Sequence, residues 1–149
     1  MPKAKLRAAT VGGTADDIET QFYDALQTGD IDKLMACWAD EDHIVCVHPG
    51  GPRLIGSASI RAAFEAMFAN GTIAARPEQI NKVDSLTSAV HNVIERVALI
   101  TADSKREALV VATNVYQRTA QGWRLVAHHA SPGTAAAHAE THDIPQVLH

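Results

Sequence analysis

The sequence of 149 residues is poor in several features that define whole classes of protein. It contains only two cysteines, Cys37 and Cys46, which are too few for a disulfide framework and lack metal-ligand spacing. We therefore expect two reduced, mostly buried thiols in a cytoplasmic protein. No apolar run approaches the roughly 20 residues of a membrane span, and the basic start lacks the apolar core of a secretory signal.

Positive charge is also scarce and is never concentrated. Charged residues make up 20% of the chain, the formal net charge is -4, and lysine and arginine form no cluster. A nucleic-acid partner requires such a cluster, so we expect neither a nucleic-acid nor a membrane partner. The apolar fraction of 46% is ordinary, and the length suits one domain with a proper core.

The first half of the chain has helical patterning. Thr14 and Asp30 are predicted to cap two helices, the first of which ends at Gly29, and Ser57 is predicted to cap a third. A Pro-Gly-Gly-Pro turn at 49–52 separates two short strands. The predicted elements, in chain order, are the helices 14–29 and Ile31–Ala39, the strands Ile44–His48 and Arg53–Ile55, and the helix 57–70.

The second half has strand patterning, with a bend expected at Pro77. Helices early and strands late predict an α+β domain, in which helices cover one face of a curved antiparallel sheet. Ala89–Thr101 is apolar on both faces, so we expect helices in front of it and a partner subunit behind it, in a homodimer. The predicted strands are Thr72–Val83, Ala89–Thr101, Ala108–Arg118 and Trp123–Ala130, within a domain 14–131 flanked by a flexible leader 1–13 and a tail 132–149.

The last two predicted strands form a hairpin that ends in His128-His129. We assign Gly122 to the left-handed position of a three-residue loop, which places Thr119 opposite Trp123. In that register Asn114 faces His128 and Thr113 faces His129, whereas a two- or four-residue loop would shift the pairing by one. Because strand side chains alternate, the two imidazoles point to opposite faces of the sheet.

Three segments, 18–41, 47–68 and 114–132, resemble the nuclear transport factor 2-like superfamily. They read IETQFYDALQTGDIDKLMACWADE, VHPGGPRLIGSASIRAAFEAMF and NVYQRTAQGWRLVAHHASP, and the last is similar to the SnoaL-like cyclase branch. Over Asp16–Ser131, the resemblance implies the cone-shaped α+β fold of ketosteroid isomerases, scytalone dehydratase and polyketide cyclases. Two departures stand out. Where isomerases of the family carry carboxylates this chain has Ala112 and Asn114, and where the kinase association domain carries arginines it has Asn114 and Ala130.

Histidines are the first candidates for chemistry. His48 ends a strand where the resemblance places the lip of a cavity, and it is either a general base near neutral pH or a residue that holds the turn. His128 shares a face with Asn114 and Tyr116, a trio suited to polarising a carbonyl. His129 stands where cyclase-like relatives carry a recurring histidine. The alternative for both is a polar residue satisfied by its neighbours.

Glu95 is an acid inside an apolar strand. A buried carboxyl with a raised pKa would serve as an acid or base, and the alternative is a salt-bridged interface residue. His91 shares its face, and Trp38 and Tyr116 are expected to be pocket or core walls. We therefore assign catalytic roles to His48, Glu95, His128 and His129, and substrate-binding roles to Trp38, His91, Asn114 and Tyr116.

No cofactor is expected, and no metal site is predicted. The histidines His48, His91, His128 and His129 are far apart in sequence or adjacent on a strand, without a helical pair. His138 and His142 in the tail have i, i+4 spacing and would bind metal only adventitiously.

Two functions fit these residues. The first is an acid–base enzyme (isomerase, cyclase or dehydratase) that acts on a small hydrophobic carbonyl compound without a cofactor. The alternative is a non-catalytic module of the same fold that binds a ligand or dimerises.

Overall fold

The computed structural model describes residues 13–100 and 105–133. The predicted leader and tail fall almost wholly outside the described residues. Helices precede most of the strands, and the α+β expectation is confirmed. The elements are α2 (Ala15–Thr28), α3 (Ile31–Met35), β1 (Val45–Val47), β2 (Arg53–Ile55), α4 (Ser57–Phe68), β3 (Ala75–Asp84), β4 (Ser88–Ile100), β5 (Lys105–Thr119) and β6 (Gly122–Pro132).

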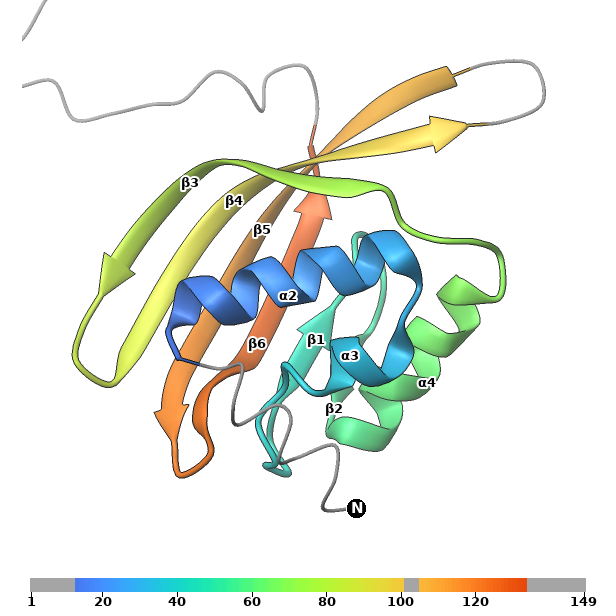
Figure 1. The fold of residues 1–149 in the computed structure, drawn as a ribbon. Coiled ribbons are helices and arrows are strands. Elements are labelled where there is room, and N and C mark those ends of the chain that lie inside the picture. The colour runs from blue at the N-terminus through green and yellow to red at the C-terminus, as the bar shows by residue number, and fades with distance from the viewer. Residues whose placement is uncertain (1–12, 101–104, 134–149) are drawn as a thin grey trace, which may run out of the picture.

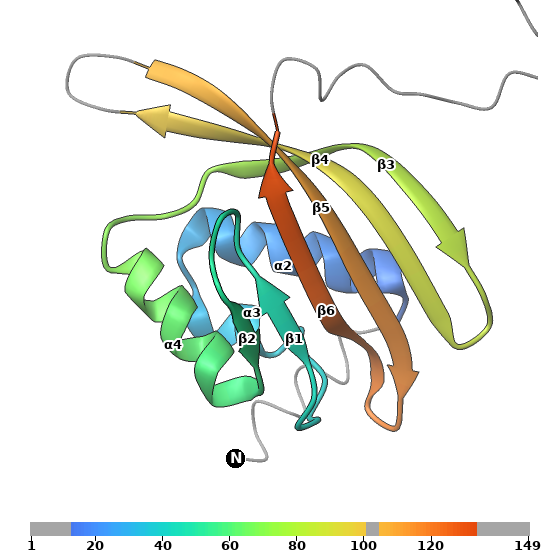
Figure 2. The same cartoon turned by 180° about the vertical axis from the view of Figure 1, so that it is seen from behind.

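The six strands form one sheet in the order β2-β1-β6-β5-β4-β3. Its pairs are antiparallel except β1 with β6, which run parallel, so the sheet is mixed rather than purely antiparallel as expected. The sheet curls around α2, which lies across its concave face (Figure 1). Seen from behind, α2, α3 and α4 of the described chain lie on one side of the sheet (Figure 2).

The helix caps follow the sequence in two of three cases. The Thr14 side chain accepts a hydrogen bond from the Asp17 N–H, and the Asp30 side chain caps α3. Gly29 ends α2 in the left-handed conformation, with φ of 69°, which favours glycine. Ser57 does not cap α4: Gly56 occupies that position with φ of 92° and makes no side-chain bond.

The second helix is shorter than predicted, because α3 ends at Met35 and not at Ala39. The backbone after Met35 hydrogen-bonds to strand β6 of the sheet. The Leu125 N–H donates to the Cys37 carbonyl at 2.7 Å, and the Ala39 N–H donates to the Leu125 carbonyl at 2.9 Å. These bonds to β6 satisfy backbone groups that would otherwise continue the helix.

The hairpin of β5 and β6 reaches the predicted pairing by a different route. Asn114 pairs with His128 and Thr113 with His129, as expected, but Thr119 pairs with Gly122 and not with Trp123. The loop is therefore the two-residue connection that would have shifted the register. A β-bulge between Val115 and Tyr116 restores it farther along the strands, because the extra residue on β6 moves every later pair by one.

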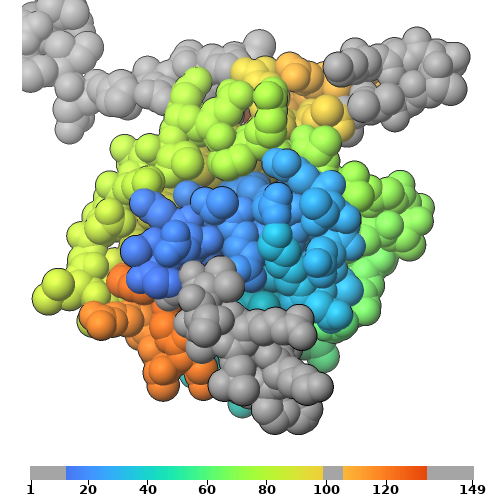
Figure 3. All heavy atoms as spheres, viewed as in Figure 1, coloured from blue at the N-terminus to red at the C-terminus, as the bar shows by residue number. Residues whose placement is uncertain are grey.

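Pro77 lies in β3 just before a second irregularity. The β3–β4 register shifts between Glu78 and Asn81, and Gln79 has φ of 48°. The strand begins at Ala75 rather than Thr72. β3 bends along the rim of the sheet (Figure 1), and its atoms lie next to those of α2 in the space-filling view (Figure 3).

The core lies between α2, α4 and the concave face of the sheet. Phe22 and Phe64 are fully buried and meet edge to face, with ring centroids 6.2 Å apart. Within the described residues, no helix is long and apolar enough to cross a membrane.

Candidate active site

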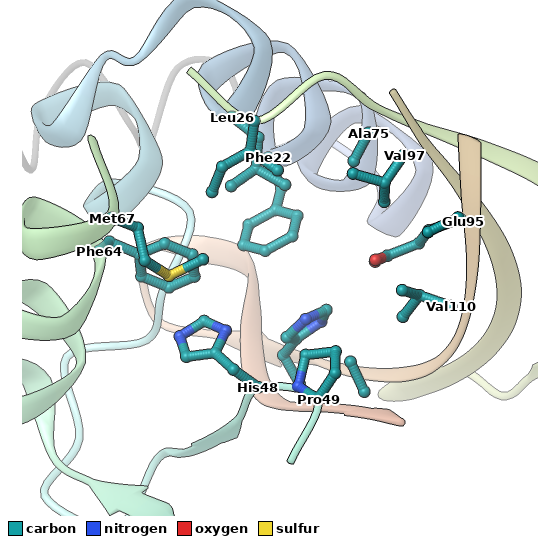
Figure 4. Close-up of a pocket in the computed structure, with 14 residues that line it drawn as sticks. Phe22, Leu26, His48, Pro49, Phe64, Met67, Ala75, Glu95, Val97 and Val110 are labelled. Atoms are coloured by element: carbon teal, nitrogen blue, oxygen red, sulfur yellow. The ribbon is translucent and has the colours of Figure 1, made fainter. Parts of the chain in front are cut away.

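A cavity of about 250 Å³ lies between α2, α4 and the concave face of the sheet. Most of its wall is apolar, from Phe22 and Leu26 on α2, Phe64 and Met67 on α4, and Val97 and Val110 on β4 and β5. Three titratable side chains also line it: His48, Glu95 and His128. Figure 4 shows Glu95 reaching in from the side opposite His48 and Phe64.

Glu95 lies on β4 between Pro77 of β3 and Val110 of β5. Its side chain is buried, and the Tyr23 hydroxyl of α2 donates to Oε2 at 2.6 Å. Burial raises the pKa of Glu95 to about 7, an effect that the bond from Tyr23 partly offsets. Its neighbour Arg96 points to the other face and pairs with Glu78 and Glu107. Glu95 is therefore a carboxyl poised to gain or lose a proton near neutral pH.

His128 is held from behind by Asn114. The Asn114 Nδ2 group donates to the Tyr23 hydroxyl at 3.0 Å and lies 3.4 Å from Glu19 Oε2. This orientation turns Oδ1 toward His128 Nδ1, 2.5 Å away. Because an amide oxygen only accepts, Nδ1 carries the proton and Nε2 carries the lone pair.

Burial keeps the His128 ring neutral. Burial, together with smaller effects of the nearby His48 and His129, lowers the pKa of His128 to about 3. His128 also packs against Phe22, with ring centroids 5.2 Å apart. A neutral imidazole with a fixed tautomer therefore faces the cavity that Glu95 enters.

His48 directly follows β1 and lies at the mouth of the cavity. Its ring meets Phe64 edge to face at 4.8 Å, and its centroid is 6.4 Å from that of His128. Burial lowers the pKa of His48, so this imidazole is also neutral at physiological pH. The His48 carbonyl accepts from the Gly51 N–H at 2.8 Å, so the residue also holds the turn. Both roles considered for His48 are thus compatible with its position.

Glu19, on α2, collects hydrogen bonds behind the cavity. Its carboxylate accepts from Tyr116 Oη at 2.9 Å and from His91 Nδ1 at 3.0 Å, and Asn114 Nδ2 lies 3.4 Å away. All four side chains are buried. Glu19 thereby orients the Asn114 amide that fixes the tautomer of His128.

The structure places the eight sequence-derived candidates in four locations. His48, Glu95 and His128 converge on the cavity. Asn114, Tyr116 and His91 lie in the hydrogen-bonded layer behind it, and Trp38 is a core residue beside β6. His129 is exposed on the opposite face of the sheet. None of the four residues expected to touch the substrate lines the cavity, because the sheet side chains that do so lie nearer the other end of each strand.

Sequence reasoning missed Glu19 and Tyr23, which connect the whole network. The sequence did contain a signal for these two residues. Glu19 is four residues before Tyr23, and both adjoin the apolar stripe of Ile18, Phe22 and Leu26. A polar residue inside a helical stripe that packs on a sheet requires a buried partner. The isolated acid of β4 supplies that partner for Tyr23.

An α+β cone that encloses an apolar cavity with a buried carboxyl and two neutral imidazoles defines a broad class of small-molecule-binding folds. The chain belongs to the family of SnoaL-like domains, whose model matches residues 16–135. The resemblance to the nuclear transport factor 2-like superfamily is thereby confirmed. No curated protein is significantly similar to the chain.

Solved structures include close matches in fold. A proposed calcium/calmodulin-dependent protein kinase type II association domain from Thiobacillus denitrificans is 34% identical, with a TM-score of 0.75, over 83% of this chain and 98% of that chain. A proposed dehydratase of the NTF2-like family from Streptomyces avermitilis is 30% identical, with a TM-score of 0.69, over 78% and 91%. The calcium/calmodulin-dependent protein kinase II hub of S. rosetta, at 18% identity and a TM-score of 0.62 over 78% and 92%, shares the fold.

Proposed function

We propose that the chain is an acid–base enzyme that acts on a small hydrophobic carbonyl compound, with Glu95 as the group that moves the proton. The observation that carries this proposal is a buried carboxyl with a pKa of about 7 at the wall of an apolar cavity. A proton-transfer group works best when its pKa lies near the working pH. A carboxyl with only a structural role would gain nothing from such a position, because burial costs it free energy.

In this proposal the ionised Glu95 takes a proton from the carbon next to the substrate carbonyl. The apolar wall excludes water, and the Tyr23 hydroxyl holds Oε2 so that the carboxylate keeps one orientation. His48 is neutral, so it can donate an N–H to the oxygen on which negative charge develops. In an isomerisation, Glu95 then returns the proton to another carbon of an unsaturated substrate. In a dehydration, Glu95 gives the proton to the hydroxyl on the neighbouring carbon, which leaves as water while the enolate electrons form the C=C bond.

His128 has a different task from His48. Its Nδ1–H is committed to Asn114, and its Nε2 lone pair accepts a hydrogen bond from a substrate hydroxyl. An acceptor at this place favours a hydroxylated carbonyl compound over a plain ketone. The proposed dehydratase from Streptomyces avermitilis, 30% identical, supports dehydration as the first reaction to test.

Proton exchange tests the proposal before the natural substrate is known. Small β-hydroxy ketones and cyclic ketones are incubated with the protein in D2O, and loss of the C–H signal beside the carbonyl is followed by NMR. We expect exchange or dehydration with the wild-type chain and its loss in Glu95→Gln. Glu65→Gln, an exposed acid on α4, is the matched control. Equal rates for wild type and Glu95→Gln on every turned-over compound would remove Glu95 from the mechanism.

A second role, self-association, is favoured by the outer face of the sheet. One aliphatic row crosses all six strands in register, through paired residues that share this face. Its members are Val83, Val90, Val115, Ala127, Val45 and Ile55. Val83 is 66% exposed, Ile55 45% and Val90 37%, and no described helix covers this face (Figure 2).

We infer that the row is buried in a homodimer, as the two-sided apolar pattern of β4 predicted. The proposed association domain from Thiobacillus denitrificans, 34% identical, supports an assembling role for the fold. Sedimentation velocity tests this: Val90→Lys should give monomers, whereas Leu86→Lys in the β3–β4 turn, which is 86% exposed, should leave the wild-type state unchanged. A monomeric wild-type chain would contradict the inference.

A further inference from the structure

A second cavity lies at the far end of the hydrogen-bonded layer. In this region α2 begins beside the β3–β4 turn (Figure 1). It measures about 200 Å³ and is lined by Asp16, Asp84, Ser85 and Trp123, among others. Asp84 and His91 lie on the concave face of the sheet, and Asp16 lies in the first turn of α2. Nothing in the proposed reaction uses these groups.

His91 has an unsatisfied nitrogen beside Asp16 and Asp84, two of the residues that line this cavity. Its side chain is fully buried, and Nε2 has no hydrogen-bond partner within the described part of the chain. Two carboxylate oxygens lie near it, Asp84 Oδ1 at 3.5 Å and Asp16 Oδ1 at 3.9 Å. A nitrogen lone pair that faces two carboxylates is unfavourable unless a proton or a metal cation lies between them.

The spacing of these atoms matches the spacing of metal ligands. Two ligands that are each about 2.0–2.2 Å from one tetrahedral ion lie about 3.4 Å apart. The separations of 3.5 and 3.9 Å from Nε2 are close to this value, and binding requires the two exposed aspartates to move toward Nε2 and toward each other. Asp16, Glu19 and His91 offer ligand atoms that lie within 4.8 Å of one another, and Asp84 approaches this group through His91 Nε2.

Glu19 completes the arrangement from the other side of the ring. It accepts the Nδ1–H of His91 at 3.0 Å, so in the neutral ring the lone pair of Nε2 faces Asp16 and Asp84. A carboxylate behind a ligating imidazole is the usual support of a protein metal ligand. We propose that His91, Asp16 and Asp84 form a site for a first-row divalent transition-metal ion such as Zn²⁺, with Glu19 as the orienting partner of His91.

Lys82 makes the site testable without disturbing the core. Its ammonium donates to Asp16 Oδ1 at 2.9 Å, and the bond to Asp16 raises the pKa of Lys82. In the metal-free chain Lys82 is therefore the cation that neutralises Asp16, and a metal ion must displace it. Removing the lysine should strengthen metal binding, a gain that a misfolded variant cannot produce.

The experiment is calorimetric titration of the full-length chain with Zn²⁺, with Mg²⁺ in parallel because imidazole ligands disfavour it. All proteins carry His138→Ala and His142→Ala, since that tail pair would bind metal on its own. The variants are Asp84→Asn and Lys82→Ala. The matched controls are Asp24→Asn and Lys33→Ala, which break the ion pair between Asp24 and Lys33 elsewhere on the surface.

We expect one Zn²⁺ site, with affinity weakened about tenfold or more in Asp84→Asn and strengthened several-fold in Lys82→Ala. The two control variants should bind as the parent does, and Mg²⁺ should not compete. NMR of the His91 ring nitrogens should place the shift on Nε2. Absence of binding, or binding that neither Asp84→Asn nor Lys82→Ala alters, overturns the proposal and leaves the cleft as a solvated ion-pair cluster.

Discussion

Two buried glutamates, Glu95 and Glu19, lie on opposite sides of the same hydrogen-bonded layer and differ in what surrounds them. They are similarly buried, at 6% and 4% exposed. Glu19 receives bonds from Tyr116 and His91 and faces the Asn114 amide, whereas Glu95 receives one, from Tyr23, and otherwise faces an apolar cavity.

The contrast shows that burial alone does not decide what a carboxyl can do. Donors that converge on a carboxylate stabilise its charge and commit its oxygens, as at Glu19. A single donor leaves desolvation dominant, and the pKa of Glu95 rises to about 7. The first environment suits a structural anchor, and the second suits proton transfer.

The largest expected effect is on turnover. Glu95→Gln should lower kcat/KM by about 10²–10⁴-fold on any compound that the wild-type chain converts, because the side chain can no longer exchange a proton. The fold should be retained, since glutamine keeps an oxygen that accepts the Tyr23 hydroxyl. Rates and a urea unfolding curve measured on the same preparation check both statements. If Glu95→Gln both lost activity and unfolded, the variant would contradict the expected difference between a proton-transfer role for Glu95 and a structural role for Glu19.

Glu19→Ala should instead damage stability. It leaves the Tyr116 hydroxyl, the His91 Nδ1–H and part of the Asn114 amide buried without their acceptor. Each such group costs about 1–3 kcal/mol, so the free energy of unfolding should fall by about 3 kcal/mol or more. Urea unfolding measures the change, and Glu65→Ala on the surface of α4 should stay within about 0.5 kcal/mol of wild type. A small loss for Glu19→Ala would mean that water replaces the carboxylate.

The third effect is a pH dependence of stability that Glu95 should give. Its pKa rises from 4.5 to about 7 on folding, so the folded state binds the proton more tightly. The contribution of Glu95 to stability is complete below pH 4.5 and is lost as the pH rises through 7, by roughly 3 kcal/mol. The difference in unfolding free energy between wild type and Glu95→Gln, measured at pH 5 and pH 8, should change by this amount.

His128 acts in the opposite direction over part of the same range. Its pKa falls from 6.5 to about 3 on folding, so its contribution to stability is lost as the pH drops from 6.5 toward 3. Comparing wild type with Glu95→Gln removes this background because both chains contain His128. An identical pH slope in the two chains would contradict the raised pKa of Glu95.

The fold was more predictable than the site because it depends on patterns local in sequence. The N-cap at Thr14, the left-handed Gly29 and the strand Arg53–Ile55 all follow from a few adjacent residues. The pairing of Asn114 with His128 was predicted for a wrong reason, since a two-residue loop and a bulge compensate each other. The position of a bulge depends on packing across the sheet, and no residue of the hairpin predicts the bulge between Val115 and Tyr116.

The site depends on contacts between distant segments. Tyr23 meets Glu95 across 72 residues, and Tyr116 meets Glu19 across 97. Glu95 could be singled out as an acid in an apolar strand, but its partner could not be chosen among several polar residues. The cleft at His91 was equally hidden, because His91, Asp84 and Asp16 adjoin only after α2 has packed on the sheet.

The smallest effect separates the two tyrosines of the layer. Tyr23→Phe removes the one donor to Glu95, a bond that lowers the pKa of that carboxyl, so the pKa should rise further. Tyr116→Phe removes a donor from Glu19 and should leave the titration of Glu95 in place, although each variant should lose about 1 kcal/mol of stability. The side-chain carboxyl ¹³C shift of Glu95, followed from pH 5 to 9, distinguishes them. A shifted midpoint in both variants would mean that the hydrogen bonds of Glu19 also set the pKa of Glu95, and the contrast between an anchor and a proton-transfer group would fail.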